Sequence, residues 1–164
     1  MLSSLPPVAL DEAPQPYVIQ ALVPADIDAL MEIERLSFKS PWSRQVFEEE
    51  IARSWAYVDV LRSTATGVLV GFCNYWLVAD EVHVLNVASH PQERRQGHAS
   101  RLMAHVIEYA RRAACRLVTL EVRRSNEAAL RLYQRFAFKS VGVRPNYYVD
   151  DNEDAVVMVL ELGS

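Results

Sequence analysis

The spacing of apolar positions divides the first half of the chain into two helical segments followed by three extended ones. Residues 24–38 repeat apolar side chains every three or four positions, which predicts an amphipathic helix. Ser43 is placed to cap a second helix within 43–54. Extended runs follow at 56–62, 67–79 and 81–89, and their short connections predict antiparallel pairing. The predicted buried face of the first helix comprises Ile27, Leu30, Met31, Ile33 and Leu36.

The second half changes to a strand, helix, strand pattern. A helix that begins near Gly97 is predicted, and 116–122 is a nearly continuous apolar strand. A strand, a helix and a strand within about 35 residues form a βαβ unit with parallel strands. A helix at 126–137 and strands at 139–144 and 154–162 complete the pattern. The fold class is therefore α/β (α+β), with a mixed, mostly antiparallel central sheet flanked by helices. The apolar face of the central helix comprises Leu102, Met103, Val106, Ile107 and Ala110.

Length and composition indicate a single domain preceded by a short extension. The 164 residues are about half apolar, which suits one domain and is too short for two. Four of the eight prolines lie near the start, so we expect a proline-rich flexible extension over 1–17 and one domain over 18–162.

Charge and cysteine usage exclude several classes of function. The net charge of −4 argues against binding along a nucleic-acid backbone. Cys73 and Cys115 lie in apolar segments without metal-binding or redox spacing, so we expect reduced, buried thiols and no metal site. No basic leader and no apolar run approaching about 18 residues occurs. We therefore expect a cytoplasmic protein with no membrane partner.

The stretch RRQGHA, residues 94–99, stands at the start of the predicted central helix. A helix N-terminus presents unpaired backbone N–H groups and can hold phosphate oxygens. Gly97 allows close approach of the backbone, Ala99 leaves the first turn uncrowded, and Arg94 and Arg95 add charge. Taken alone, the stretch favours an ordinary junction of loop and helix with surface arginines, because a short glycine-containing loop is a weak motif.

Three further residues are candidates for chemistry. Glu121 is a carboxylate within an apolar strand, where burial is expected to raise its pKa toward neutrality and make it a proton acceptor. The alternative is a strand end at which Glu121 pairs with Arg123 or Arg124. Asn126 is placed to cap the next helix, and Tyr133 is a core position whose phenol could reach a cleft.

With these residues in view, the chain resembles the Gcn5-related N-acetyltransferase (GNAT) superfamily over about Val18 to Leu162. The stretch RRQGHA fits the acetyl-CoA signature of that superfamily through Arg94, Gly97 and Ala99. The segments LNVASHP, LEVRRSNEAALRLYQRFAF, RPNYY and EDAVVMVLEL are most similar to the bacterial ribosomal-protein alanine N-acetyltransferases. Gln96 departs from that pattern, because relatives often carry arginine there.

The resemblance implies acetyl-CoA as the acetyl donor and a role for each site residue. Glu121 would be the general base and Tyr133 the general acid. Trp42, Tyr147 and Tyr148 would line the groove for the acceptor. The implied cofactor-binding residues are Val87, Ala88, Ser89, Arg94, Arg95, Gln96, Gly97, His98, Ala99, Ser100 and Asn126.

The acceptor implied by the resemblance is the N-terminal amine of a protein, with the N-terminal alanine of a small-subunit ribosomal protein as the best match. Two alternatives stay open at this point. One is a GNAT enzyme that acts on a small molecule or a lysine, and the other is an acyl-CoA-binding module without catalysis. The sequence leaves the oligomeric state open, and a monomer is compatible with it.

Overall fold

The computed structural model describes residues 15–163, so most of the extension predicted for 1–17 lies outside the described residues. The strands are β1 (Tyr17–Ala21), β2 (Ala56–Ser63), β3 (Leu69–Val78), β4 (Glu81–Ser89), β5 (Leu117–Arg123), β6 (Lys139–Tyr148) and β7 (Glu153–Glu161). The helices are α1 (Ile27–Ser37), α2 (Arg44–Ala52), α3 (His98–Arg112) and α4 (Glu127–Arg135). Short 3-10 turns, η1 (Pro24–Asp26) and η2 (Pro91–Glu93), precede α1 and α3.

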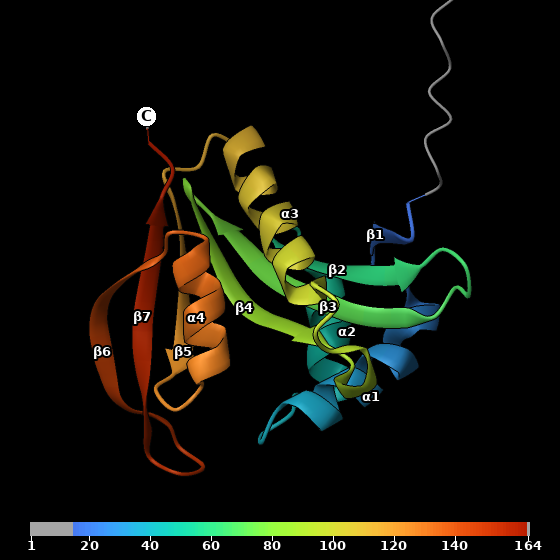
Figure 1. The fold of residues 1–164 in the computed structure, drawn as a ribbon, viewed down its shortest axis with the longest axis horizontal. Helices are drawn as coiled ribbons and strands as arrows, with labels where there is room; N and C mark the ends of the chain where they lie inside the picture. Colours follow the sequence, from blue (N-terminus) through green and yellow to red (C-terminus); the bar gives the residue numbers. More distant parts are fainter. Residues whose placement is uncertain (1–14, 164) are drawn as a thin grey trace, which may run out of the picture.

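The seven strands form one sheet in the order β1-β2-β3-β4-β5-β7-β6 (Figure 1). Among the described strands, β4 and β5 are the only parallel neighbours, and the other five pairs are antiparallel. The predicted mixed, mostly antiparallel sheet is therefore confirmed, as is the βαβ unit formed by β4, α3 and β5. β6 continues to Tyr148, beyond the predicted end at residue 144.

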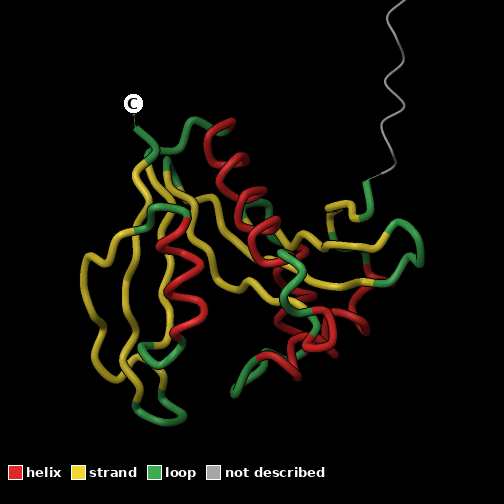
Figure 2. Tube along the Cα trace, in the orientation of Figure 1, coloured by secondary structure: helices red, strands yellow, loops and turns green. Residues whose placement is uncertain are grey.

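Helices cover both faces of the sheet (Figures 1 and 2). The face under α3 and α4 carries the larger apolar cluster, which includes every predicted buried residue of α3 and both free cysteines. The face under α1 and α2 carries a second cluster around Leu30, Ile33 and Phe47. The prediction for α1 was wrong at one position, because the Leu36 residue is 53% exposed and Glu34 is buried instead.

A β-bulge in β4 creates the opening on which the site depends. Asn74 pairs with Asn86 and Tyr75 pairs with Val84, so Leu85 is an extra residue in β4. The bulge changes which side chains of β4 face each side of the sheet. Val84 belongs to the larger apolar cluster under α3, whereas Ala88, four residues on, belongs to the cluster under α1. The β4–β5 ladder also ends here, with Val84 opposite Leu120. Beyond this point the two strands diverge (Figure 1).

The start of the described chain belongs to the sheet. β1 begins at Tyr17 and pairs with β2. The carbonyls of Gln15 and Pro16 accept hydrogen bonds from the side chain and the backbone N–H of Thr64, at 2.7 and 3.0 Å. Residues 15–17 thus contact the edge of the sheet formed by β2 and the turn that follows it. No helix among residues 15–163 is long and apolar enough to cross a membrane.

Candidate active site

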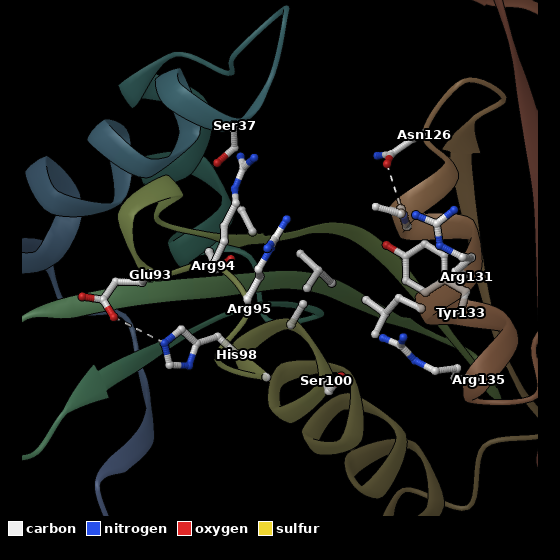
Figure 3. A pocket seen from close by; sticks show the side chains of 18 of the residues that line it. Ser37, Glu93, Arg94, Arg95, His98, Ser100, Asn126, Arg131, Tyr133 and Arg135 are labelled. Atoms are coloured by element: carbon white, nitrogen blue, oxygen red, sulfur yellow. Dashed lines mark hydrogen bonds and ion pairs between the residues drawn. The ribbon is translucent and has the colours of Figure 1, made fainter.

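A cavity of about 570 Å³ opens between the N-terminus of α3 and the side of α4 (Figure 3). Its walls come from the end of β4, the connection from β4 to α3, the first turn of α3 and one face of α4. In Figure 3, Arg94 and Arg95 lie on one side of the opening and Arg131, Tyr133 and Arg135 on the other. Most of the predicted cofactor residues line it: Val87, Ala88, Ser89, Arg94, Arg95, Gly97, His98, Ala99, Ser100 and Asn126.

The N-terminus of α3 has the backbone geometry that an anion site requires. Gly97 is the N-cap residue with φ of 77°, and Arg95 also has a positive φ, of 66°. A Cβ added at Gly97 would meet no atom within 4 Å, so the backbone borders open space. The unpaired N–H groups of the first helical turn and the helix dipole favour negative charge at this position. The predicted junction of loop and helix is therefore suited to hold a diphosphate.

Two arginines that the sequence reasoning missed add positive charge to this cavity. Arg131 and Arg135 stand one turn apart on α4 and line the wall opposite Arg94 and Arg95. Their spacing of four residues places them on one helix face. The spacing of Arg131 and Arg135 could have indicated this pair in the sequence, because Asn126 starts the same helix and lines the same cavity.

Two predicted cofactor residues direct their side chains elsewhere. Gln96 is absent from the cavity lining, and its side chain accepts a hydrogen bond from the Tyr17 hydroxyl at 3.1 Å. The His98 side chain points toward Glu93 (Figure 3), and its ring packs edge-on against Tyr17 at 4.6 Å between centroids. Burial lowers the pKa of His98. The contribution of His98 to this cavity therefore comes from its backbone.

The end of β4 supplies a second set of backbone groups. Because the ladder with β5 ends at Val84, the edge of residues 85–89 that faces β5 has no strand partner within the described sheet. Val87, Ala88 and Ser89 line the first cavity along this edge. Ala88 pairs with Phe72 of β3, whereas the N–H and C=O groups of this edge that point away from β3 can bind an extended amide-containing chain as another strand would.

A second cavity, of about 360 Å³, adjoins the first at the gap between β4 and β5. It is lined by residues from the α1–α2 connection, β4, β5, α4 and the end of β6. Trp42, Tyr147 and Tyr148, the predicted acceptor-binding residues, all belong to its walls. The two cavities share Phe38, Val87, Asn126, Ala129 and Tyr133.

Glu121 lines the second cavity, directly after the last β5 residue that pairs with β4. Its side chain is 10% exposed, and its Oε2 lies 2.6 Å from the Nε2 of His83. Arg144 lies 3.6 Å from Oε1. The expectation of a raised pKa was wrong in direction, because the hydrogen bond from His83 lowers the pKa of Glu121 and outweighs burial.

The alternative ion pair considered for Glu121 also does not form. Arg123 binds Asp150, Asp151 and Glu153, and Arg124 binds Asp154. Both arginines therefore bind carboxylates in the turn between β6 and β7 and at the start of β7. The carboxylate of Glu121 remains at the cavity wall.

Tyr133 connects the two cavities. It lies on α4, packs in the larger apolar cluster and lines both spaces. Figure 3 shows its ring reaching from α4 into the opening. Burial raises the pKa of Tyr133 to about 12, so its hydroxyl keeps its proton at neutral pH. Asn126 caps the same helix, its Oδ1 accepting from the N–H of Ala129 at 3.2 Å, as predicted.

A network of charged side chains joins the two loops beside the second cavity. Lys39 in the α1–α2 connection binds Asp151 at 2.8 Å, and Ser40 donates to Asp150 at 2.9 Å. Arg123 binds the same two aspartates, and its guanidinium stacks on the Tyr148 ring at 4.0 Å. We call Lys39, Ser40, Arg123, Asp150 and Asp151 the loop clasp. The sequence reasoning missed this cluster.

Comparison with known proteins decides the family. The family model described as "Acetyltransferase (GNAT) family" matches residues 27–138, more than half of the chain. The chain belongs to the GNAT acetyltransferase family. The "[Ribosomal protein bS18]-alanine N-acetyltransferase" of Escherichia coli K12 is 32% identical over 147 residues, covering 88% of this chain and 97% of that protein. A Bacillus subtilis relative is 38% identical over 133 residues, covering 81% of this chain and 87% of that protein.

Solved structures agree with this GNAT assignment. The ribosomal-protein-S18-alanine N-acetyltransferase from Escherichia coli has a TM-score of 0.82 at 31% identity, covering 90% of this chain and 95% of that one. Ard1 from Thermoplasma volcanium has a TM-score of 0.80 at 27% identity, covering 91% and 99%. The protein is thus an acetyl-CoA-dependent N-acetyltransferase with a single GNAT fold, and the alternative of a module without catalysis is set aside.

The residues of the first cavity fit acetyl-CoA. A helix N-terminus with four nearby arginines suits the negatively charged diphosphate, and the free edge of β4 suits the amides of the pantetheine arm. The thioester would then lie near the shared wall of the two cavities, beside Tyr133.

Proposed function

We propose that this GNAT enzyme acetylates the N-terminal amine of a protein, with the N-terminal alanine of ribosomal protein bS18 as the acceptor. The observation that carries the proposal is the acceptor cavity itself, where Glu121 and Tyr133 line one space with three aromatic side chains. The relatives support the choice of acceptor, because the Escherichia coli protein named for this activity matches nearly its full length.

We further propose that Glu121 is the general base. A peptide α-amine has a pKa near 8, so only about a tenth of it is free at pH 7. Once the amine nitrogen begins to bond to the acyl carbon, its proton becomes strongly acidic. Glu121, kept ionised by its lowered pKa, can then accept that proton. When bound, acetyl-CoA supplies an acetyl group activated as a thioester.

Two other groups complete the proposed site. Backbone N–H groups along Val87 to Ser89 stabilise negative charge on the acetyl oxygen. Tyr133 retains its proton at neutral pH and donates it toward the departing thiolate sulfur. Transfer is direct. Cys73 and Cys115 belong to the buried cluster and line neither cavity, so no thiol of the described chain is placed to carry the acetyl group.

A thiol-release assay with a matched set of amines tests the acceptor. The set contains a peptide with the bS18 N-terminal sequence, the same peptide with a blocked N-terminus and an internal lysine, and a polyamine. We expect kcat/KM for the free N-terminus to exceed that for the blocked peptide by at least about tenfold, the discrimination that one well-placed polar contact supplies. Faster turnover of the lysine or the polyamine would contradict the proposal.

Mass spectrometry of ribosomal proteins provides the test in cells. Cells that lack this chain should lose N-terminal acetylation of bS18 and regain it when the chain is restored. The same acetylation in both strains would contradict bS18 as the acceptor and leave the thiol-release result to identify another protein N-terminus.

A further inference from the structure

A histidine stands directly behind the carboxylate that we assign as the base. His83 lies on β4 and Glu121 on β5, and their Nε2 and Oε2 atoms are 2.6 Å apart. Glu121 lines the acceptor cavity, whereas His83 lines neither cavity. The side chain of His83 is 28% exposed and that of Glu121 is 10% exposed. His83 therefore contacts the base from the side opposite the acceptor.

The surroundings of His83 fix the orientation of its ring. The Trp76 indole on β3 packs against it edge-on, with centroids 6.2 Å apart and planes at 88°. Trp76 is itself held, because its Nε1 donates to the buried carboxylate of Glu50 at 2.7 Å. The imidazole thus reaches Glu121 from a supported position, and only one carboxylate oxygen is engaged by it.

We propose that His83 is a positioning residue that orients the Glu121 carboxylate toward the acceptor. The inference rests on the proposed function, in which Glu121 takes a proton from the acceptor amine. With Oε2 held by the Nε2–H of His83, Oε1 is the oxygen left for the acceptor.

The proton balance is simple. The proton leaves the acceptor nitrogen as the C–N bond forms and goes to Oε1 of Glu121. The Nε2–H of His83 stays on Oε2 throughout, so no proton passes through the ring. After the product leaves, Oε1 returns its proton to water, and the Tyr133 hydroxyl regains from water the proton that it gave to the thiolate. His83 is unchanged.

Other groups that face the pair do not substitute for His83. Arg144 from β6 lies 3.6 Å from Oε1, the other carboxylate oxygen. The Thr119 hydroxyl on β5, opposite His83 in the β4–β5 ladder, donates to the carbonyl of Met158. The Trp76 indole donates to Glu50. Among the described residues, His83 is thus the side chain that holds Oε2.

Three variants separate positioning from general structural effects. His83→Gln offers an uncharged N–H donor to Oε2, and His83→Ala offers none. His105→Gln is the matched control, because His105 pairs with Asp59 at 2.8 Å and both residues lie outside the two cavities. We measure kcat at saturating peptide and acetyl-CoA from pH 5.5 to 9, together with thermal unfolding and the affinity for acetyl-CoA.

In His83→Gln, kcat at pH 8 should stay within about threefold of that of the natural protein, because a donor to Oε2 remains. His83→Ala, which has no donor, should lose about tenfold or more in kcat. Acetyl-CoA affinity should not change, and His105→Gln should match the natural protein.

Each contrary result is informative. A loss of kcat in His83→Gln as large as that in His83→Ala, or an unchanged kcat in His83→Ala, would overturn the proposal, and so would an equal loss in His105→Gln. A midpoint of thermal unfolding close to that of the natural protein excludes misfolding as the cause of a lower kcat. If no peptide N-terminus is acetylated at all, the proposed acceptor fails instead. The same comparison is then made with the amine that is acetylated, because every amine must lose a proton.

Discussion

The two adjoining cavities are built from different parts of the protein. The first takes its binding groups mainly from backbone, at the N-terminus of α3 and the free edge of β4, with arginines at its rim. The second takes them from side chains on several separate segments, including two loops joined by the loop clasp. Backbone recognition tolerates many sequences, whereas side-chain recognition changes with each substitution. We therefore expect the proposed donor site to vary less among relatives than the proposed acceptor site.

Within the acceptor cavity, two carboxylates show that burial alone does not set a pKa. Burial raises the pKa of Glu34 to about 7, and the hydrogen bond that one oxygen accepts from the Trp42 N–H at 3.1 Å offsets only part of that rise. The other oxygen has no partner among the described residues. Glu121 has its pKa lowered, because the hydrogen bond from His83 outweighs burial. The balance between burial and the neighbouring donor thus decides which carboxylate is ionised and ready to act at neutral pH.

Glu121→Gln should have the largest effect and should leave the first cavity intact. Losing a general base costs about 10² to 10⁴ in rate, so kcat at pH 7 should fall by at least about a hundredfold. Part of that loss should be recovered at pH 9, where solvent hydroxide can take the proton of the attacking nitrogen in place of the carboxylate. Acetyl-CoA affinity, measured by calorimetry, should be unchanged. Unaltered turnover at pH 7 would refute the role of Glu121.

Gly97→Val should damage the first cavity only. A β-branched residue at φ of 77° is strained, and its side chain would occupy the space beside the α3 N–H groups. We expect acetyl-CoA affinity to fall by about a hundredfold, comparable to two or three lost charge-assisted hydrogen bonds. Gly67→Val is the matched control, with φ of 74° and the same open surroundings in the β2–β3 turn. Equal affinities in the two variants would contradict the diphosphate site.

Tyr133→Phe tests the residue that the two cavities share. The ring and its packing remain, so acetyl-CoA should bind as before. Removing the proton donor should lower kcat by about ten- to a hundredfold, the lower part of the range for acid catalysis. A loss confined to acetyl-CoA affinity would mean that the hydroxyl serves binding rather than proton donation.

Lys39→Ala should have a smaller effect, confined to the acceptor. The Lys39 side chain is 66% exposed, and exposed ion pairs are worth little individually. We expect KM for the peptide to rise by about threefold, with kcat and acetyl-CoA affinity unchanged. Because salt screens such pairs, the difference from the natural protein should narrow at 0.5 M NaCl. Lys139→Ala, outside both cavities, is the control.

The sequence predicted the elements and most of the residues that line the first cavity, because both depend on local patterns. Every predicted helix and strand exists, and the caps at Ser43 and Asn126 form as expected. The bulge at Leu85 could not be predicted, because nothing in the alternation of 81–89 marks an extra residue. The partner of Glu121 could not be predicted either, because it is distant in sequence. His83 lies 38 positions away, and only the parallel ladder brings the two together.

Glu34→Gln should have its main effect on stability, and its sign follows from the raised pKa. A carboxyl whose folded-state pKa rises from 4.5 to about 7 stabilises the fold below the lower value and loses that contribution as pH rises through the higher one. The glutamine keeps an acceptor for Trp42 without the buried charge. From pH 5 to pH 8, the variant should therefore gain about 2 kcal/mol in free energy of unfolding relative to the natural protein. Urea denaturation at both pH values measures this, with exposed Glu32→Gln as the control, and parallel pH profiles would show that Glu34 is already ionised at pH 5.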